Sequence, residues 1–240
     1  MGLIAAFANP ARFMALSRWL APSLGVVAAA LLASGLWMAM AMPDDYQQGA
    51  TVRILPLHIA AAYMSLFCYA CLAGASFFGL VFRHSLADAA AKAAAPLGAI
   101  FTALCLATGS LWARPMWGTW WVWDGRLTSV FILFLIYLGY MALHAAIDDE
   151  AKAARAAAIL ALVGVVNLPI IHFSVEWWNT LHQGATLITP TGPKAPPTYL
   201  WPAGLIAVGY MTLFGALWLV RIRSEVWRRR AGQLAMAAAG

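Results

Sequence analysis

Two histidines and a tryptophan-rich segment are the residues of this sequence whose types and spacing best suit binding chemistry. His58 stands at the start of a long apolar run, and His182 follows the pair Trp177-Trp178. The segment WGTWWVWDGRLTS, residues 117–129, holds four of the twelve tryptophans within seven residues. A neutral imidazole binds metal ions, and aromatic rings stack on flat apolar molecules. This combination suggests a flat ligand that contains a metal.

The tryptophan segment has two interpretations. Four of its residues follow the spacing i, i+3, i+4 and i+7: Trp117, Trp120, Trp121 and Asp124. They share one face if the segment is helical, and Trp123 then projects elsewhere, near Arg126. Alternatively, the tryptophans form an interfacial belt and Asp124 caps the next helix. A belt usually scatters its aromatic residues over all helix ends, whereas these are concentrated, but on spacing alone both interpretations stand.

The composition predicts that helices in a membrane position these residues. Only 10% of the residues are charged, 63% are hydrophobic, and the mean hydropathy is +0.77. Six apolar stretches are long enough to cross a bilayer as helices: about 22–42, 57–82, 96–113, 129–147, 156–174 and 202–221. Strands with open edges are excluded in lipid because their backbone groups stay unpaired. We therefore expect an all-α membrane protein with six transmembrane helices.

The first apolar stretch resembles a secretory signal. Arg12 and Arg18 precede it, and it ends in the small-residue pattern Ala39-Met40-Ala41. Its apolar core exceeds the roughly 7 to 15 residues of such signals, so a retained helix is expected.

Lys and Arg are distributed unequally between the loops. Eleven of the fifteen fall in the N-terminal segment, the second and fourth loops and the C-terminal tail. The other four are Arg53, Arg114, Arg126 and Lys194. Because cytoplasmic loops carry the excess of positive charge, we expect both termini in the cytoplasm and a periplasmic loop at 114–128. Residues 1–240 then form a single six-helix membrane domain. The net charge of +6 reflects this bias, so the expected contact is membrane lipid and no nucleic acid.

His58 and His182 are both expected at the outer surface, at the depth of the tryptophans. Pro56 fits the first turn of a helix, and the positive end of that helix disfavours a charged His58. A short helix over 176–182 would place Trp178 and His182 on one face. Two imidazoles would then stand at the edge of an aromatic surface.

The remaining histidines and the cysteines have structural interpretations. His84 and His144 lie toward the cytoplasmic side, and His172 lies near a kink at Pro169 that Asn167 or a neighbouring helix supports. The pattern Cys68-x-x-Cys71 falls inside a membrane helix, as does Cys105, far from groups that stabilise a thiolate. We interpret the three thiols as packing residues.

Haem is the molecule that matches two imidazoles at one depth, aromatic faces and nearby cations. Its iron accepts axial histidines, and its porphyrin stacks on aromatic rings. Its propionates can pair with arginines, and three are predicted on this side: Arg53, Arg114 and Arg126. The sequence leaves open which of them do so.

The sequence closely resembles the haem-handling protein C family of the bacterial cytochrome c maturation system (CcmC), one of the tryptophan-rich haem-handling families. The resemblance rests on residues 117–129, on VNLPIIHFSVEWWNTLHQG at 166–184 and on LPLH at 55–58, and it covers about residues 18–222. One departure is Gly125, where alanine is expected in many relatives. Its effect should be mild.

This resemblance implies that non-covalent haem b lies at the periplasmic face, with His58 and His182 as axial ligands to its iron. The tryptophan segment would be the platform, and further contacts would come from Trp178 and from residues of the segment: Trp117, Trp120, Trp121, Trp123, Asp124 and Arg126. It implies an inner-membrane protein that passes haem to a periplasmic haem chaperone, protein E of the system. Other implied partners are the ABC transporter proteins A and B and the small single-helix protein D.

The residues predict a transfer protein, because the chain has no apparent bond-making residue and so is not expected to be an enzyme. Two other functions stay open. In the first, the six helices export haem as a channel subunit, although no ionisable residue is expected at mid-helix to mark a pathway. In the second, the chain is a b-type electron-transfer cytochrome, although such proteins place paired histidines within the membrane.

Overall fold

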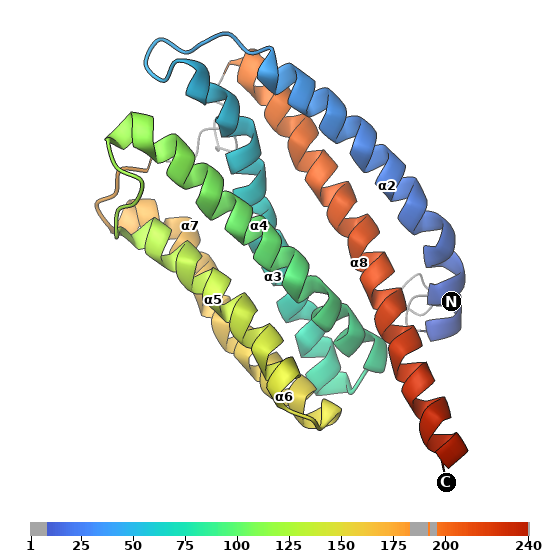
Figure 1. Cartoon of the computed structure of the whole chain (residues 1–240). Coiled ribbons are helices and arrows are strands. Elements are labelled where there is room, and N and C mark those ends of the chain that lie inside the picture. The colour runs from blue at the N-terminus through green and yellow to red at the C-terminus, as the bar shows by residue number, and fades with distance from the viewer. Residues whose placement is uncertain (1–8, 183–191, 193–195, 240) are drawn as a thin grey trace.

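We describe a computed structural model of the chain, in which residues 9–182, 192 and 196–239 are placed (Figure 1). Its described part contains helices and no β-strand. The elements are α2 (Pro10–Met40), the 3-10 helix η1 (Ala50–Ile54), α3 (Leu55–Phe82), α4 (Ser85–Trp117), α5 (Gly125–Ala146), α6 (Glu150–Val163), the 3-10 helix η2 (Gly164–Val166), α7 (Asn167–Trp177) and α8 (Pro197–Ala239).

The predicted set of six membrane-spanning helices is confirmed by length and composition within the described residues. Five spans are built on α2, α3, α4, α5 and α8, and the other is formed by α6, η2 and α7 together. Asn167 follows the irregular turn in that span, and its side-chain amide donates to the backbone carbonyl of Ser129 in α5 at 2.8 Å. This hydrogen bond ties the start of α7 to α5 next to the irregular turn.

Three helices extend further than the apolar stretches predict. α2 begins at Pro10 instead of about 22, α4 begins at Ser85 instead of about 96, and α8 continues to Ala239. The added segments are rich in alanine, the strongest helix former. Hydropathy marks only the part of a helix that lies in lipid, whereas helix propensity continues beyond it.

Side-chain caps begin several of these helices. Asn9 accepts from the backbone N–H of Ala11 at 2.9 Å, with Pro10 in the first turn of α2. Asp124 accepts from the N–H of Leu127 at 2.8 Å at the start of α5. Asp149 does the same for α6. Each side chain pairs an N–H that has no partner within its helix.

The bundle is held together by close helix contacts and by buried hydroxyl groups. α3 packs along α4, and α8 packs between α2 and these two helices, while α5 joins α4 to α6 and α7. The Tyr69 hydroxyl of α3 donates to the Ala161 carbonyl of α6 at 2.9 Å, and the Tyr137 hydroxyl of α5 donates to the Ser65 carbonyl of α3 at 2.9 Å. In lipid, packing and such interhelical bonds replace the hydrophobic driving force.

The two ends of the bundle carry different residues. The start of α2 and the end of α8 lie at one end in Figure 1, and the segment between α4 and α5 lies at the other. Near the termini, Glu225 of α8 contacts Lys92 of α4 at 3.4 Å and Arg229 at 2.9 Å, and Arg228 joins it to Glu150 of α6. This ion-pair network ties three helices at the end that the sequence predicts to be cytoplasmic.

The tryptophan segment is not helical in its middle part, contrary to one of the two interpretations. α4 continues to Trp117 and ends at Gly118, whose φ of 74° lies in the left-handed region. α5 begins at Gly125. The irregular part is therefore residues 118–124, shorter than the predicted loop at 114–128, and a shared helical face for its tryptophans is wrong.

Candidate functional site

A cavity of about 260 Å³ opens between α3, α4, α5 and α7 at the end of the bundle opposite the termini. Five predicted site residues line it: His58, Trp117, Trp121, Arg126 and His182. Among the other lining residues are Tyr63, Gly109, Trp112, His172 and Glu176, which the sequence did not mark as site residues. The structure thus brings both predicted ligand histidines to one cavity from segments more than a hundred residues apart.

His58 lies in the first turn of α3, and its hydrogen bonds define its tautomer. Nδ1 is 3.1 Å from the Cys105 carbonyl and 3.2 Å from the Thr108 hydroxyl of α4. A carbonyl only accepts, and the Thr108 hydroxyl already donates to the Leu104 carbonyl at 2.6 Å. Nδ1 must therefore carry the proton. The lone pair is left on Nε2, which is the arrangement of a histidine that binds a metal.

α4 leaves space for this imidazole at a glycine. A Cβ atom placed on Gly109 would lie 2.8 Å from Cε1 of His58. Real Cβ atoms essentially never approach so closely. Any larger residue at Gly109 must displace the His58 ring, which makes this glycine part of the site.

A row of aromatic rings connects the two histidines. Trp112 stacks near His58 with ring centroids 6.3 Å apart and planes 23° apart. The ring centroid of Trp117 lies 6.0 Å from that of Trp112 and 4.8 Å from that of His182. Trp112 is held by a hydrogen bond from Nε1 to the Gln48 side chain at 2.8 Å. The wall between the imidazoles is therefore aromatic, as a stacking ligand requires.

His182 is oriented by Asp124. Nδ1 of His182 lies 3.3 Å from Oδ2 of Asp124, and the Thr180 hydroxyl donates to the same carboxylate oxygen. The other oxygen, Oδ1, accepts from Leu127. One carboxylate thus begins α5 and holds the imidazole, so that Nε2 is again left for a metal. A carboxylate behind a ligating histidine is a common support of metal sites.

The protonation states of this pair favour metal binding. Burial acts to raise the pKa of Asp124, but hydrogen bonds from Thr180 and from the Leu127 backbone outweigh it and the pKa lies below its ordinary value. Burial lowers the pKa of His182, and the Asp124 carboxylate only partly opposes this shift. At neutral pH, therefore, Asp124 is charged and His182 is neutral, the form that binds a metal.

The structure distinguishes between the three arginines that the sequence predicts on the outer side. Arg126 lines the cavity, and its guanidinium donates to the His172 carbonyl at 3.1 Å and to the Ser174 hydroxyl at 3.1 Å. Arg53 is paired with Asp44 at 2.8 Å, and Arg114 lies over the Trp120 ring at 5.9 Å. Neither of these two lines the cavity. Arg126 is the cation that the cavity offers to an anionic group.

The tryptophans divide into two groups. Trp117 and Trp121 line the cavity, and the indole N–H of Trp121 is buried without a hydrogen-bond partner among the described residues. Trp120, Trp123 and Trp178 do not line it and are 54%, 73% and 49% exposed. Trp120 and Trp123 follow the turn that ends α4, and Trp178 follows the end of α7, so these three exposed rings lie outside the cavity.

Trp178 also differs from its prediction. α7 ends at Trp177, and Trp178 has an extended backbone, so the predicted short helix over 176–182 is wrong. The Trp178 ring lies against Gly125, where a Cβ would be 3.0 Å from its Cε3 atom. Because half of the ring is exposed, an alanine there can be accommodated by a small shift, in agreement with the mild effect expected at this position.

The other histidines and the cysteines lie mostly as predicted. Nδ1 of His84 accepts from the Ala87 backbone at the start of α4, and His144 packs against Tyr140 near the termini. His172 is different, because it lines the cavity as well as standing beside the irregular turn. Cys68, Cys71 and Cys105 are free thiols inside α3 and α4. Within the described ranges, no group of three or more His, Cys, Asp or Glu residues is arranged to hold a metal ion.

Residues that are close in space but distant in sequence were missed. Gly109 and Trp112 of α4 lie against His58, and Gln48, which precedes η1, accepts a hydrogen bond from Trp112. No local sequence pattern links these residues to His58. Trp112 had one available signal, since it lies at the end of the predicted stretch 96–113, five residues before Trp117. No local pattern marks Thr180.

Comparisons with known proteins identify the family to which the chain is similar. A family model described as "Heme exporter protein C" (CcmC) matches residues 3–237. The protein named "Heme exporter protein C" of Bradyrhizobium diazoefficiens is 54% identical over 229 residues, which is 95% of this chain and 87% of the relative. Relatives of the same name from Escherichia coli K12 and Paracoccus denitrificans are 47% and 44% identical, over 91% and 95% of this chain and 89% and 95% of their own lengths.

Proposed function

The chain belongs to the Heme exporter protein C family, and from that premise we propose that it holds haem at the periplasmic face and delivers it for cytochrome c maturation. His58 and His182 are the proposed axial ligands of haem b, bound without a covalent link. The observation that carries this proposal is that both imidazoles line one cavity with Nδ1 engaged by the protein and Nε2 left over.

The cavity residues suit each part of haem. The rings of Trp112, Trp117 and Trp121 offer stacking faces for the porphyrin. The Arg126 guanidinium and the unpaired indole N–H of Trp121 offer donors for a propionate. Trp120, Trp123 and Trp178, originally expected to contact haem, are proposed instead as the outward surface around the opening. The proposed haem contacts are therefore a subset of the tryptophans, and the whole tryptophan segment is no longer proposed as one flat platform.

The size of the cavity supports delivery over permanent storage. Its volume of about 260 Å³ lies below the roughly 300 to 1,000 Å³ of sites that enclose small molecules. A porphyrin in this cavity therefore keeps one edge outside, where a partner can reach a vinyl group. We propose that the partner is the periplasmic haem chaperone, protein E, and that proteins A, B and D of the system assemble around this chain in the inner membrane.

The proposed orientation places both termini in the cytoplasm. It is supported by the excess of Lys and Arg in the segments at the termini end. The cavity, at the other end of the bundle, then faces the periplasm. Haem transfer to the chaperone should accordingly occur on that side alone.

The decisive experiment loads the protein with haem in right-side-out and inside-out membrane vesicles and adds the apo chaperone outside. We expect haem to reach the chaperone only from right-side-out vesicles, with His144→Ala as an unaffected control protein. Equal transfer from both kinds of vesicle would contradict the orientation. Haem that enters sealed vesicles containing this protein alone would favour an export channel, and rapid reversible reduction by a quinol with haem retained would favour a cytochrome.

Gly109 provides a first structural prediction. Gly109→Ala should displace the His58 ring and weaken haem binding by about tenfold, the lower range for loss of support behind a metal ligand. Gly74→Ala in α3 is the matched control, since a Cβ there meets nothing within 4 Å. Haem titration of the two purified proteins checks this, and equal affinities would show that the ring is not confined by Gly109.

Acidification provides a second prediction. Protonated His182 cannot bind iron, and its pKa lies below the ordinary value of about 6.5 because the ring is buried. The neutral form thus persists at and above that pH, and haem should be lost only as pH falls further below about 6.5. Soret absorbance after gel filtration at a series of pH values measures the loss. Release that begins above about pH 7 would contradict the assigned state of His182.

A further inference from the structure

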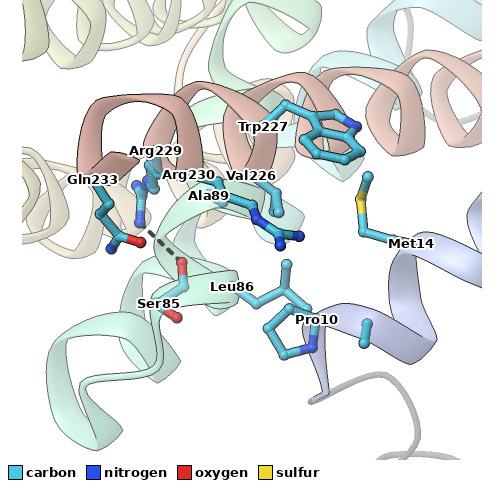
Figure 2. Close-up of a pocket in the computed structure, with 11 residues that line it drawn as sticks. Pro10, Met14, Ser85, Leu86, Ala89, Val226, Trp227, Arg229, Arg230 and Gln233 are labelled. Carbon is cyan, nitrogen blue, oxygen red and sulfur yellow. Dashed lines mark hydrogen bonds between the residues drawn. The ribbon is translucent and has the colours of Figure 1, made fainter. Parts of the chain in front are cut away.

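A second cavity, of about 440 Å³, lies at the termini end of the bundle, opposite the histidine site. Figure 2 shows it with side chains from the starts of α2 and α4 and from the last turns of α8 around one open space. Its lining residues are Pro10, Ala11, Met14, Ser85, Leu86, Ala89, Val226, Trp227, Arg229, Arg230 and Gln233. Neither the proposed function nor the comparisons assign a role to this cavity.

One side of the cavity is positively charged. Arg229 is oriented by Glu225 at 2.9 Å and by the Ser85 carbonyl at 3.1 Å, a contact drawn in Figure 2. The Arg230 guanidinium lies 5.8 Å from the Trp227 ring centroid and has no acidic partner among the placed residues. Among the residues that the structure describes, no lining residue is acidic. The N-terminal ends of α2 and α4 border the same space and add partial positive charge.

The other side of the cavity is apolar. Leu86 and Ala89 belong to a small hydrophobic cluster with Phe13, and Met14 and Val226 pack against it. This cluster is separate from the main core of the bundle. The cavity therefore joins a basic wall to an apolar floor, which suits an amphiphile better than a free anion.

The position of the cavity identifies the kind of amphiphile. It lies beyond the apolar part of α8, which ends near residue 221, and next to Trp227, which is 55% exposed. Exposed tryptophans mark the headgroup level of a membrane. Basic pockets between membrane helices at that level bind anionic lipid headgroups.

We propose that this cavity binds the headgroup of an anionic phospholipid, with its phosphate at Arg229 and Arg230 and its glycerol and first acyl carbons over Met14, Leu86 and Val226. A bound lipid contacts α2, α4 and α8 at once. It thereby fastens α2, which otherwise packs mainly on α8, to the rest of the bundle. The proposal is independent of haem, because it concerns the opposite end of the molecule.

Native mass spectrometry of the delipidated full chain tests this, with phosphatidylglycerol and phosphatidylcholine of identical acyl chains. We expect the wild type to prefer phosphatidylglycerol. Arg230→Gln should lower phosphatidylglycerol affinity about fivefold, the value of one basic side chain near an anionic surface. Ala11→Glu, which places a carboxylate on the exposed opposite wall, should lower it at least as much. Arg221→Gln, on the exposed surface of α8 outside the cavity, is the matched control and should bind like wild type.

Three outcomes would overturn the proposal. Equal binding of the two lipids by the wild type would remove the headgroup preference. Equal losses in Arg221→Gln and Arg230→Gln would reduce the effect to general surface charge. Glycerol phosphate that competes as strongly as the intact lipid would show an anion site without a lipid. Thermal unfolding without lipid should match the wild type in all three variants. If Arg230→Gln unfolds at a lower temperature than the wild type, Ala11→Glu provides the test instead.

Discussion

Replacing both His58 and His182 by alanine is expected to abolish haem binding, and each single substitution should weaken it by more than about a hundredfold. Loss of a group that merely supports a metal ligand costs about 10- to 100-fold, so loss of the ligand itself should exceed that range. Both imidazoles already have Nδ1 engaged, by Cys105 and Thr108 on one side and by Asp124 on the other. Nε2 of each ring is therefore the atom left to bind the iron. A changed haem spectrum in either variant would report the loss of that bond.

The measurement is the haem spectrum and dissociation constant of each purified variant. His144→Ala is the matched control, because His144 is a histidine of α5 near the termini and far from the cavity. It should bind haem like the wild type. Wild-type occupancy in both His58→Ala and His182→Ala would remove the axial assignment, even if transfer to the chaperone were lost. His172→Ala separates the neighbouring histidine, which lines the same cavity; a spectrum changed only in that variant would move the ligand to α7.

Replacing Asp124 should have the second largest effect, because one carboxylate performs two tasks. Asp124→Ala removes the cap of α5 as well as the partner of His182 Nδ1. We expect a loss of about 1 kcal/mol in stability from the cap and of about 10- to 100-fold in haem affinity from the missing support. Asp124→Asn should retain most of the cap, since asparagine is also a good N-cap, but lose the charge that holds the imidazole.

Asp149→Ala is the control that separates the two tasks. Asp149 caps α6 through the backbone N–H groups of Ala151 and Lys152, both at 3.0 Å, and contacts no cavity residue. It should lower thermal stability as Asp124→Ala does and leave haem affinity unchanged. If Asp124→Asn bound haem like the wild type, Asp124 would be a helix cap alone, and His182 would be oriented by Thr180 without it.

The tryptophans near the cavity form two sets, inside and outside it. Trp112 and Trp117 stand between the histidines inside the cavity, whereas Trp120 and Trp123 remain on the outside. Under the proposed function, the rings inside the cavity would retain the porphyrin, and the exposed rings would be available to a partner.

Local features of the sequence were sufficient for the membrane helices, and they marked residues that the structure brings to one cavity. Apolar runs of adequate length locate the spans, because each span must pair its own backbone groups in lipid. Pro56 before His58 and Asp124 before α5 are start signals that act within a few residues of the chain. The arrangement of His58, His182 and the tryptophan segment came in part from family resemblance, which conveys spatial proximity that no spacing rule contains.

Tertiary structure decided the contacts within the candidate site. It brings Gly109 and Trp112 of α4 to His58, places only Arg126 of the three arginines predicted on the outer side at the cavity, and leaves Trp120 and Trp123 outside it. The physical reason is that periodicity and capping report forces between residues within about one helical turn, while these contacts depend on how separate helices pack. The Cys105 carbonyl supports His58, and the Asp124 carboxylate supports His182. Both contacts exist only because α3, α4, α5 and α7 meet at one end of the bundle.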